Sequence, residues 1–390
     1  MVAFLQQGRD YVHRHTITHD PSRPTVRFTT QTHTPSSSHS IPTGRYGIRA
    51  FDTAPYYDSS EIVLGTALNA LSHEFPRGSY QLITKVGRYG PSPSDFDYSP
   101  EALRKSVRRS LQRLHTQYLD FVYLHDIEFI APCITPRIEG VHTSALDTEA
   151  RAYGLEPPYK PDTSGADERI LEAIATLRAL QADGLIRHIG ICGTCSPLLH
   201  THTLTQKKKK QGLQLPTLLR TAQLVLARTG RPLDAVQSYA HLTLQNGTLS
   251  AFVKHFSNSS TSANVRQVFA ASPLGMGLLA PPPAAPPAWH PAPKALRDAA
   301  SEAVRVVGNE EIAKVALAWS VRVAAAAEEG RMPVVVGMSN VREVHEAVEA
   351  WRWARDEGRQ EELTRKAALA QDVFERTGMA GWTWASGNWS

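Results

Sequence analysis

Short apolar runs alternate with amphipathic segments along most of the chain. The runs at 49–52 (RAFD), 80–85 (YQLITK) and 118–125 (YLDFVYLH) are typical of strands that are covered on both faces. A helix is predicted over residues 60–72. Another begins at Ser99-Pro100-Glu101, where a capping serine, a proline and an acidic residue open the first turn. Strands that alternate with helices in this way indicate a parallel sheet with helices packed on it.

The same alternation continues toward the C-terminus and gives seven buried strands in all. The further predicted strands are GLIRHIGICG, which ends near Cys192, and the segments 233–239, 265–272 and 332–338. The further predicted helices cover 166–183, the Ala-rich segments 293–307 and 309–328, and 341–353. Repeated βα units of this kind place the chain in the α/β class.

Residues 1–48 break the pattern, because they are rich in Ser, Thr, His, Pro and Arg. TVRFTTQ (25–31) is the only strand candidate there, and no amphipathic helix separates it from Arg49. Either this segment replaces a βα unit in an unusual way, or the chain is an imperfect gene model. Its Arg-rich, acid-poor composition is also typical of a mitochondrial transit peptide. The barrel domain is expected over 49–378, with insertions near 128–165 and 200–216 and a C-terminal tail at 379–390.

Composition narrows the class of protein further. A chain of 390 residues with 42% hydrophobic positions can bury one large α/β core, and its net charge of +5 is spread thinly outside Lys207–Lys210. That tetralysine is expected to be a solvated loop, because no aromatic residues interleave it. No apolar run approaches the length of a membrane span. Three cysteines do not suggest a disulfide framework, so a reducing, cytoplasmic location is expected. We expect no nucleic acid, membrane or obligate protein partner.

Four residues with useful chemistry follow the first three of these strands. Asp52, Lys85 and His125 close their apolar runs, and Tyr57 comes five residues after Asp52. The carboxyl ends of barrel strands are where (β/α)8 enzymes build their active sites. A tyrosine, a lysine, a carboxylate and a histidine gathered there predict a proton-transfer site for alcohol and carbonyl chemistry.

These motifs, in this order, resemble the aldo-keto reductase superfamily. The resemblance rests on FDTAPYY with SE, on TK and on YLH. The later stretches DAVQSYAHLTLQN, ASPLGMGLLAPPPAAPPAWHPAP and VVVGMSNVREVHEAVEAW also carry it. Within that superfamily the chain is similar to the NAD-dependent D-arabinose and L-galactose dehydrogenases, from about Arg49 to about Trp351. The resemblance implies a (β/α)8 TIM barrel of eight strands, with the first βα unit atypical or missing here.

The resemblance also assigns roles to the four residues. Tyr57, rather than Tyr56, would take the proton from the anomeric hydroxyl of a sugar. Lys85 would lower the pKa of this phenol, since a nearby positive charge favours the ionised form. Asp52 would pair with Lys85, and His125 would orient the substrate oxygen.

The cofactor-binding residues are also assigned by resemblance. GMGLLA (275–280) matches a dinucleotide fingerprint, but that fingerprint must open a helix and dense prolines follow it here. The resemblance instead makes this stretch the loop that approaches the cofactor diphosphate, through Ser272, Leu274 and Gly275. Gln237 matches a glutamine that holds the nicotinamide carboxamide.

The turn GMSNVREV (337–344) matches the adenosine-ribose site of the family. Gly337, Ser339 and Glu343 are the residues expected there, and a carboxylate at this place repels the 2′-phosphate of NADP. Arg342 argues the other way, because it could reach a phosphate. NAD is therefore the expected cofactor, with NADP possible.

The predicted reaction is the oxidation of an aldose at C1 to the lactone with NAD. The resemblance names a D-arabinose-like sugar, with L-galactose or L-fucose possible, and nothing in the residues themselves selects the sugar. The alternatives are an NADP-dependent aldehyde or ketone reductase, and an inactive homologue with a binding role. No metal is expected, because Cys192 and Cys195 form a single CxxC without a second pair of ligands.

Overall fold

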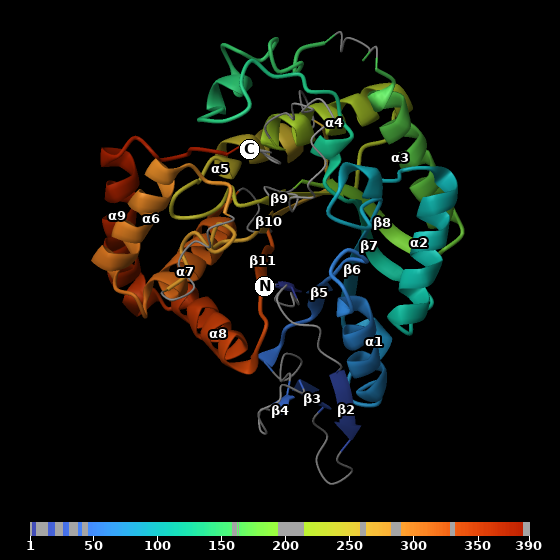
Figure 1. The fold of residues 1–390 in the computed structure, drawn as a ribbon, viewed down its shortest axis with the longest axis horizontal. Coiled ribbons are helices and arrows are strands. Elements are labelled where there is room, and N and C mark those ends of the chain that lie inside the picture. Colours follow the sequence, from blue (N-terminus) through green and yellow to red (C-terminus); the bar gives the residue numbers. More distant parts are fainter. Residues whose placement is uncertain are drawn as a thin grey trace.

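The computed structural model describes residues 2–4, 15–19, 26–30, 38–40, 46–157, 162, 164–193, 214–257, 263–281, 290–327 and 332–384. Within these ranges the chain forms a closed barrel of parallel strands surrounded by helices (Figure 1). The strand order around the barrel is β1-β11-β10-β9-β8-β7-β6-β5. The predicted (β/α)8 fold is therefore confirmed.

The barrel strands keep the order of the chain. They are β1 (Val2–Phe4), β5 (Ala50–Asp52), β6 (Gln81–Val86), β7 (Leu119–Leu124), β8 (Ile186–Cys192), β9 (Ala235–Tyr239), β10 (Gln267–Ala271) and β11 (Val334–Gly337). The helices are α1 (Ser60–Ala70), α2 (Pro100–Arg113), α3 (Ala166–Ala182), α4 (Gln214–Thr229), α5 (Leu249–Ser257), α6 (Lys294–Val307), α7 (Ile312–Ala326), α8 (Val341–Arg355) and α9 (Gln360–Arg376). Short 3₁₀ turns are η2 (Arg77–Ser79), η3 (Pro93–Asp95), η4 (Ile127–Phe129), η5 (Thr143–Leu146) and η7 (Glu357–Arg359).

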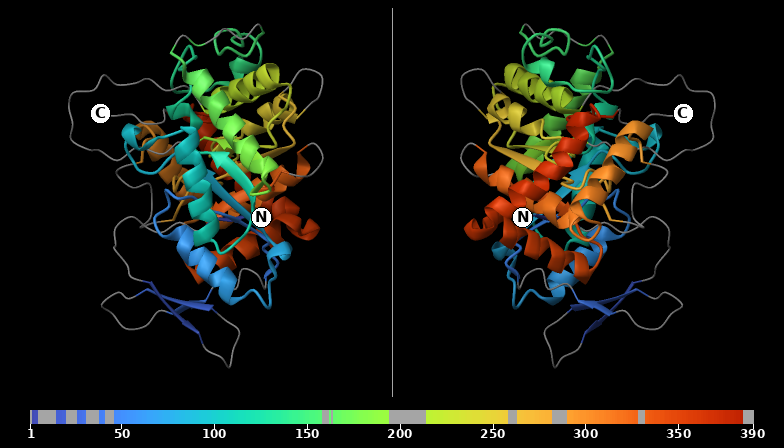
Figure 2. Two further views of the ribbon diagram at one scale, coloured as in Figure 1. Left: turned by 90° about the vertical axis from the view of Figure 1, so that its right-hand side faces the viewer. Right: turned by 90° about the vertical axis from the view of Figure 1, so that its left-hand side faces the viewer.

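The eighth strand comes from the start of the chain. Ala3 of β1 pairs with Val336 of β11 on one side and with Phe51 of β5 on the other, so β1 closes the barrel. The segment expected to supply an N-terminal strand, Val26–Thr30 (β3), instead pairs with β2 (His15–His19) and β4 (Ser38–Ser40). This small antiparallel sheet lies outside the barrel (Figure 2). This sheet stands between β1 and β5 in the chain, which makes the first βα unit atypical as predicted.

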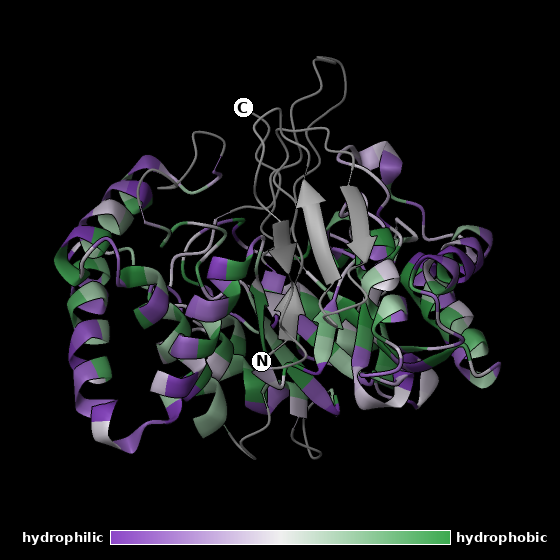
Figure 3. Ribbon diagram, turned by 90° about the horizontal axis from the view of Figure 1, so that it is seen from below, coloured by the Kyte–Doolittle hydropathy of each residue, from purple (hydrophilic) through white to green (hydrophobic). Residues whose placement is uncertain are grey.

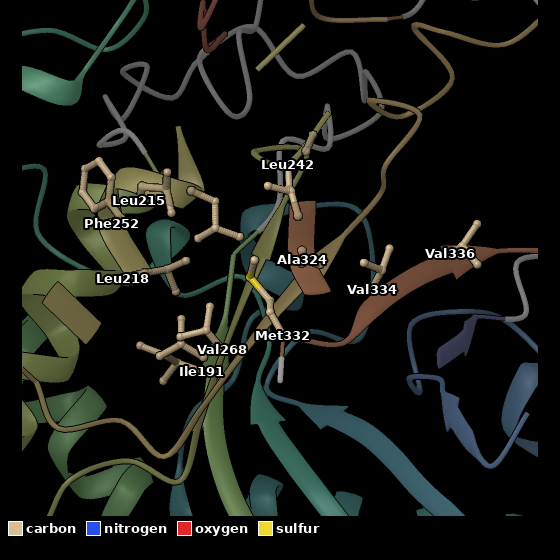
Figure 4. Packing of buried hydrophobic residues seen from close by; sticks show 14 of the residues in the cluster. Ile191, Leu215, Leu218, Leu242, Phe252, Val268, Ala324, Met332, Val334 and Val336 are labelled. Atoms are coloured by element: carbon tan, nitrogen blue, oxygen red, sulfur yellow. The ribbon is translucent and has the colours of Figure 1, made fainter. Parts of the chain in front are cut away.

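Two apolar layers hold the barrel together. On β7, Phe121 and Tyr123 belong to a cluster inside the barrel, whereas Val122 and Leu124 belong to the larger cluster between strands and helices. Figure 4 shows part of that outer layer, where hydrophobic side chains of β8, β10 and α4 gather. A fully buried aliphatic side chain contributes about 1.5–3 kcal/mol. Burial on both faces explains why the strands are apolar along their whole length.

The outer helices present hydrophilic residues to solvent and hydrophobic residues to the strands (Figure 3). At the start of α2, the Ser99 side chain accepts a hydrogen bond from the Ala102 backbone N–H at 3.4 Å, and Pro100 is the first helical residue. The predicted start of this helix is therefore confirmed. None of the helices in the described ranges has both the length and the apolar character needed to cross a bilayer.

Residues 379–384, which were expected to belong to a tail, are held against the barrel. The Gln245 side chain donates hydrogen bonds to the carbonyls of Met379 at 2.7 Å and Trp382 at 3.0 Å. Gly140, from the expected insertion at 128–165, exchanges two backbone hydrogen bonds with Thr383. The insertion and the C-terminal segment thus support each other beside the loop that follows β9.

Candidate active site

The fold brings the four candidate catalytic residues together. Asp52 is the last residue of β5, Lys85 is the second-last of β6, and His125 directly follows β7. These three strands are neighbours in the barrel, so their carboxyl ends lie side by side. Tyr57 lies in the turn between β5 and α1, where its hydroxyl reaches the His125 ring.

Lys85 and Asp52 form a buried ion pair. The Lys85 Nζ donates a hydrogen bond to Asp52 Oδ1 and another to the Thr53 carbonyl at 3.2 Å. Burial raises the pKa of Asp52, and the positive charge of Lys85 opposes that shift. The pairing predicted for these two residues is present in the structure.

Tyr57 and His125 meet edge to face above this ion pair. The Tyr57 Oη lies 3.5 Å from His125 Nε2, and the two ring centroids are 5.6 Å apart at 87°. The Lys85 Nζ lies 4.7 Å from the centre of the Tyr57 ring. A substrate oxygen placed between phenol and imidazole would contact both groups that can move or share its proton.

The net direction of the Tyr57 pKa shift is opposite to the one expected. We expected Lys85 to lower the pKa of Tyr57, but burial raises it well above its ordinary value, and the carboxylates of Asp52 and Asp126 raise it further. Burial, followed by Lys85 and Arg88, lowers the pKa of His125 well below its ordinary value. Both groups are therefore neutral at pH 7: the phenol carries a proton that it can donate, and the imidazole is uncharged.

The sequence did not single out two charged residues at this site. Arg88 follows β6 and Asp126 follows His125, and their side chains form an ion pair in which each is 1% exposed. The Asp126 Oδ1 lies 3.6 Å from His125 Nε2. A charged residue two positions after each of two active-site strands, in VGRYG and LHDIEF, was the available signal.

His125, Asp126 and Cys192 bring potential metal-ligand atoms within 4.8 Å of one another. Asp126 is already paired with Arg88, and burial raises the pKa of the Cys192 thiol well above its ordinary value. The arrangement favours hydrogen bonding over metal coordination, and a metal-free site stays a prediction.

Gln237 on β9 fits the predicted nicotinamide contact. Its side chain is buried, and Oε1 has no hydrogen-bond partner among the described residues. It also lies close enough to Asp52 to influence the pKa of that carboxyl. A buried amide oxygen without a partner is costly, which indicates that a ligand such as a carboxamide pairs with it.

The loop after β10 combines several residues of positive φ with open space beside the backbone. Ser272 has a positive φ of 61°, and its hydroxyl accepts a hydrogen bond from the Met276 N–H at 2.9 Å. Gly275 and Gly277 also have positive φ, and a Cβ on Gly277 would meet nothing within 4 Å. His290 Nε2 lies 3.1 Å from the Gly275 carbonyl and fixes the loop. Strained backbone beside open space is typical of a binding loop.

The remaining predicted cofactor residues flank two strand ends. Leu274 packs partly on the core, and Gly337 ends β11 with an exposed backbone. Ser339 donates hydrogen bonds to the Glu343 carboxylate from its N–H and its hydroxyl. Asn340 caps α8 by accepting a hydrogen bond from the Glu343 N–H, and its side-chain amide donates to Glu343 Oε1, which gives this carboxylate a local role in holding the start of the helix.

The insertions contribute unequally to the site. The first reaches it through Phe129, whose ring stacks on Phe96 at 4.9 Å beside Arg88. Of the second, only residues 214–216 at the start of α4 are described. Cys195, Lys207–Lys210 and most of the proline-rich loop lie outside the described residues, so the expectations for them stay untested.

Comparison with known proteins agrees with this geometry. The model of the Aldo/keto reductase family matches residues 43–365. The chain is 33% identical to the D-arabinose 1-dehydrogenase of Saccharomyces cerevisiae over 80% of this chain and 75% of the relative. It is 31% identical to the L-galactose dehydrogenase of Arabidopsis thaliana over 86% of this chain and 84% of that protein.

Solved structures of aldo-keto reductases share the fold. An aldo-keto reductase from Bacillus halodurans in its holo form aligns with a TM-score of 0.51 and 17% identity over 85% of this chain and 84% of the other. A glycerol dehydrogenase from Gluconobacter oxydans gives 0.50 and 18% over 86% and 83%. A (β/α)8 barrel with this residue set, and a family match over most of its length, lead to one conclusion: the chain belongs to the aldo/keto reductase family.

Proposed function

We propose that this protein is an NAD-dependent dehydrogenase that oxidises a D-arabinose-like aldose at C1 to the corresponding lactone. L-Galactose and L-fucose are further candidate substrates. The observation that carries the proposal is the cluster of Tyr57, His125 and the Lys85–Asp52 pair at the carboxyl end of the barrel. The two sugar-dehydrogenase relatives support the choice of substrate class.

The residues divide the work as follows. The ionised form of Tyr57 accepts the proton that leaves the anomeric hydroxyl, and His125 holds that oxygen through its neutral imidazole. Lys85, fixed by Asp52, supplies positive charge beneath the phenol and stabilises it when it loses its own proton. A bound nicotinamide would supply the acceptor for the hydride of C1, so the sugar would lose a proton and a hydride and become the lactone.

The cofactor would be held by the residues that fit it. Gln237 offers its unpaired amide oxygen to the carboxamide, and the loop of Ser272, Leu274 and Gly275 gives the diphosphate access to the backbone.

The adenosine end would lie at the turn of Gly337, Ser339 and Glu343. NAD is favoured because the Glu343 carboxylate occupies this turn while Arg342 is ion-paired with Glu346 at 2.7 Å.

The barrel of this enzyme would comprise β1 together with residues 49–378. Of the described cysteines, the buried Cys192 is a free thiol, which suits a reducing compartment such as the cytoplasm.

The test is NADH formation followed by absorbance with D-arabinose, L-galactose, L-fucose and D-glucose, each repeated with NADP. We expect sugar-dependent NADH from at least one of the first three. The Tyr57→Phe enzyme should lose roughly 100- to 10,000-fold in kcat/KM while melting like the wild type. A correctly folded wild type without activity on any sugar would refute the proposal.

A second activity, NADP- or NAD-dependent reduction of aldehydes and ketones, has one observation in its favour. The raised pKa of Tyr57 keeps the phenol protonated, which is the state that donates a proton to a carbonyl oxygen. Measuring both directions at pH 7 decides between them. A reductase would consume NADPH with simple aldehydes faster than it forms NADH with any aldose.

A further inference from the structure

Arg88 and Asp126 form a buried ion pair directly beside the proposed proton-transfer groups. Arg88 lies two residues after β6 and Asp126 lies immediately after His125, so both come from the active-site ends of adjacent strands. The Arg88 Nη1 donates to Asp126 Oδ2, and each side chain is only 1% exposed. This pair therefore lines the site without belonging to the four residues already described.

Aromatic rings hold Arg88 in place. Its guanidinium carbon lies 3.9 Å from the centre of the Tyr56 ring, and the rings of Phe96 and Phe129 are 5.3 and 5.7 Å away. Its Nε donates to the Gly90 carbonyl at 3.3 Å. A planar guanidinium fixed in this way presents its remaining N–H groups in one orientation.

The pair leaves hydrogen-bonding capacity unused. The Arg88 Nη2 is buried and has no hydrogen-bond partner among the described residues. The Asp126 Oδ1 is 3.6 Å from His125 Nε2, which is longer than a hydrogen bond. A buried donor without a partner is costly, and a buried ion pair is a weak source of stability. The buried Nη2 of Arg88 is therefore better explained by a ligand that pairs with it, with Asp126 Oδ1 nearby as an acceptor.

The position of the pair indicates what the ligand offers. Tyr57 Oη, His125 Nε2 and Asp126 Oδ1 follow one another at 3.5 and 3.6 Å. A substrate whose reacting oxygen lies between Tyr57 and His125 would place its next oxygen toward Asp126. A hydroxyl suits this environment because it donates to a carboxylate and accepts from a guanidinium at the same time.

We propose that Arg88 and Asp126 form a binding subsite for the hydroxyl on the carbon next to the reacting carbon. This inference rests on the proposed function and deepens it: the substrate class is the α-hydroxylated aldoses, and compounds without that hydroxyl bind poorly in the transition state. Arg88 and Asp126 are substrate-binding residues here, while proton transfer stays with Tyr57.

The test pairs two substrates that differ in this hydroxyl alone. 2-Deoxy-D-ribose is D-arabinose without its hydroxyl at C2, so the ratio of their kcat/KM values isolates the contact. We expect the wild type to prefer D-arabinose by roughly 10- to 100-fold, the usual range for a hydrogen bond to a charged group. In Asp126→Asn the ratio should fall below about fivefold, through loss with D-arabinose alone. Arg88→Lys, which keeps the charge but removes Nη2, should lower the ratio part of the way.

The same strand offers a matched control. Asp120 on β7 is also buried and paired with an arginine, Arg77, but it lies near the start of the strand, away from the site. Asp120→Asn should lower the melting temperature and leave the substrate ratio at the wild-type value. If Asp126→Asn instead lowers kcat/KM equally for both sugars, the pair has a structural role and the inference is wrong.

Failure of the proposed function would be seen separately. If the wild type oxidises neither sugar, D-arabinose and 2-deoxy-D-ribose are compared by calorimetric binding to the wild type and to Asp126→Asn. Tighter binding of D-arabinose that disappears in the variant supports the subsite. Equal binding, or none, overturns it. Thermal melts of each variant establish that the comparison is made on folded protein.

Discussion

One arginine–aspartate pair lies near each end of strand β7, and the two pairs are built differently. Near the start of the strand, Asp120 Oδ2 accepts hydrogen bonds from Arg77 at 2.6 Å and from the Leu82 N–H at 2.9 Å. Its Oδ1 accepts another from Arg187 at 3.2 Å. Beyond the end of the strand, the Asp126 Oδ2 accepts a hydrogen bond from Arg88 Nη1. The first carboxylate is fully engaged by protein groups, and the second is not.

The arginines differ in the same sense. Arg77 also donates to Thr116 Oγ1 at 2.8 Å and to the carbonyls of Tyr80 and Tyr118, each at 2.9 Å. Arg88 leaves Nη2 without a partner among the described residues. In a (β/α)8 barrel the amino end of the strands serves stability and the carboxyl end serves function. The two pairs therefore differ in how many of their polar atoms are hydrogen-bonded by the protein: the Arg77–Asp120 pair suits a role in stability, and the Arg88–Asp126 pair suits a role in ligand binding.

The largest effect should follow from breaking the ion pair at the catalytic end. Lys85→Met leaves the Asp52 carboxylate buried without its cation, because both side chains are at most 2% exposed. We expect a loss of about 3–5 kcal/mol in the free energy of unfolding. We also expect at least a roughly 100-fold loss in kcat/KM, since the phenol loses its adjacent charge. Denaturant unfolding and NADH formation measure the two quantities.

The double variant Asp52→Asn with Lys85→Met separates these effects. Removing both charges should recover most of the stability, because no buried charge stays unpaired. Activity should not recover. A double variant as active as wild type would contradict the role given to Lys85.

The second-largest expected effect is the change of kcat/KM for sugar oxidation with pH. Oxidation needs the ionised phenol, and burial with the carboxylates of Asp52 and Asp126 raises the pKa of Tyr57. Between pH 7 and 9 the ionised fraction therefore rises about tenfold per pH unit, and kcat/KM for NADH formation should rise with it. The rate of reduction, which needs the protonated phenol, should stay flat over this range. A plateau in oxidation below pH 8 would show that Lys85 controls the phenol after all.

Near the start of β7, removing the arginine of the other pair should affect stability alone. Arg77→Met removes the hydrogen bonds that Arg77 donates to Asp120 and to the neighbouring loop. We expect a loss of about 2 kcal/mol in the free energy of unfolding, less than for a fully buried pair because Arg77 is 20% exposed and Asp120 keeps Arg187. The kcat/KM of the folded enzyme should stay within about twofold of wild type. A large kinetic defect would end the functional distinction between the two ends.

The sequence allowed seven strands to be predicted because barrel strands are covered on both faces. β1 was missed because a run of three apolar residues, Val2–Phe4, is too short to stand out. β3 was noticed, but Val26 and Phe28 alternate with polar residues there. That alternation is typical of a sheet with one solvated face, so the pattern itself argued against a place in the barrel.

The candidate site was predictable to a similar degree. Asp52, Lys85 and His125 end apolar strands, which is a local signal. Arg88 and Asp126 each look like an ordinary loop residue, and they meet across 38 positions, which no local pattern reveals. The wrong direction for Tyr57 came from weighing one charge pair, whereas burial has the largest influence on its pKa.

The smallest effect is expected at the start of α8, where the proposed adenosine-ribose site lies. Glu343→Gln removes a negative charge while keeping a side-chain oxygen that can accept hydrogen bonds from Ser339 and Asn340, so the melting temperature should change by less than about 2 °C. Without the repulsion of a 2′-phosphate, the ratio of kcat/KM for NADP to that for NAD should rise roughly three- to tenfold. The rise should shrink at high salt, because this turn is partly exposed and its charge is screened.

Glu349 supplies the matched control, since it lies further along the same helix and pairs with Lys314 at 2.6 Å. Glu349→Gln removes the same charge away from the turn, so its cofactor ratio should equal that of wild type. An equal rise in both variants would mean that the overall charge of the helix, rather than Glu343, sets the preference. No rise in either would leave the carboxylate with its capping role alone. At β7, the carboxylate that is hydrogen-bonded by several protein groups is the one assigned to stability. The same rule would then apply to Glu343, because it already accepts hydrogen bonds from Ser339 and Asn340.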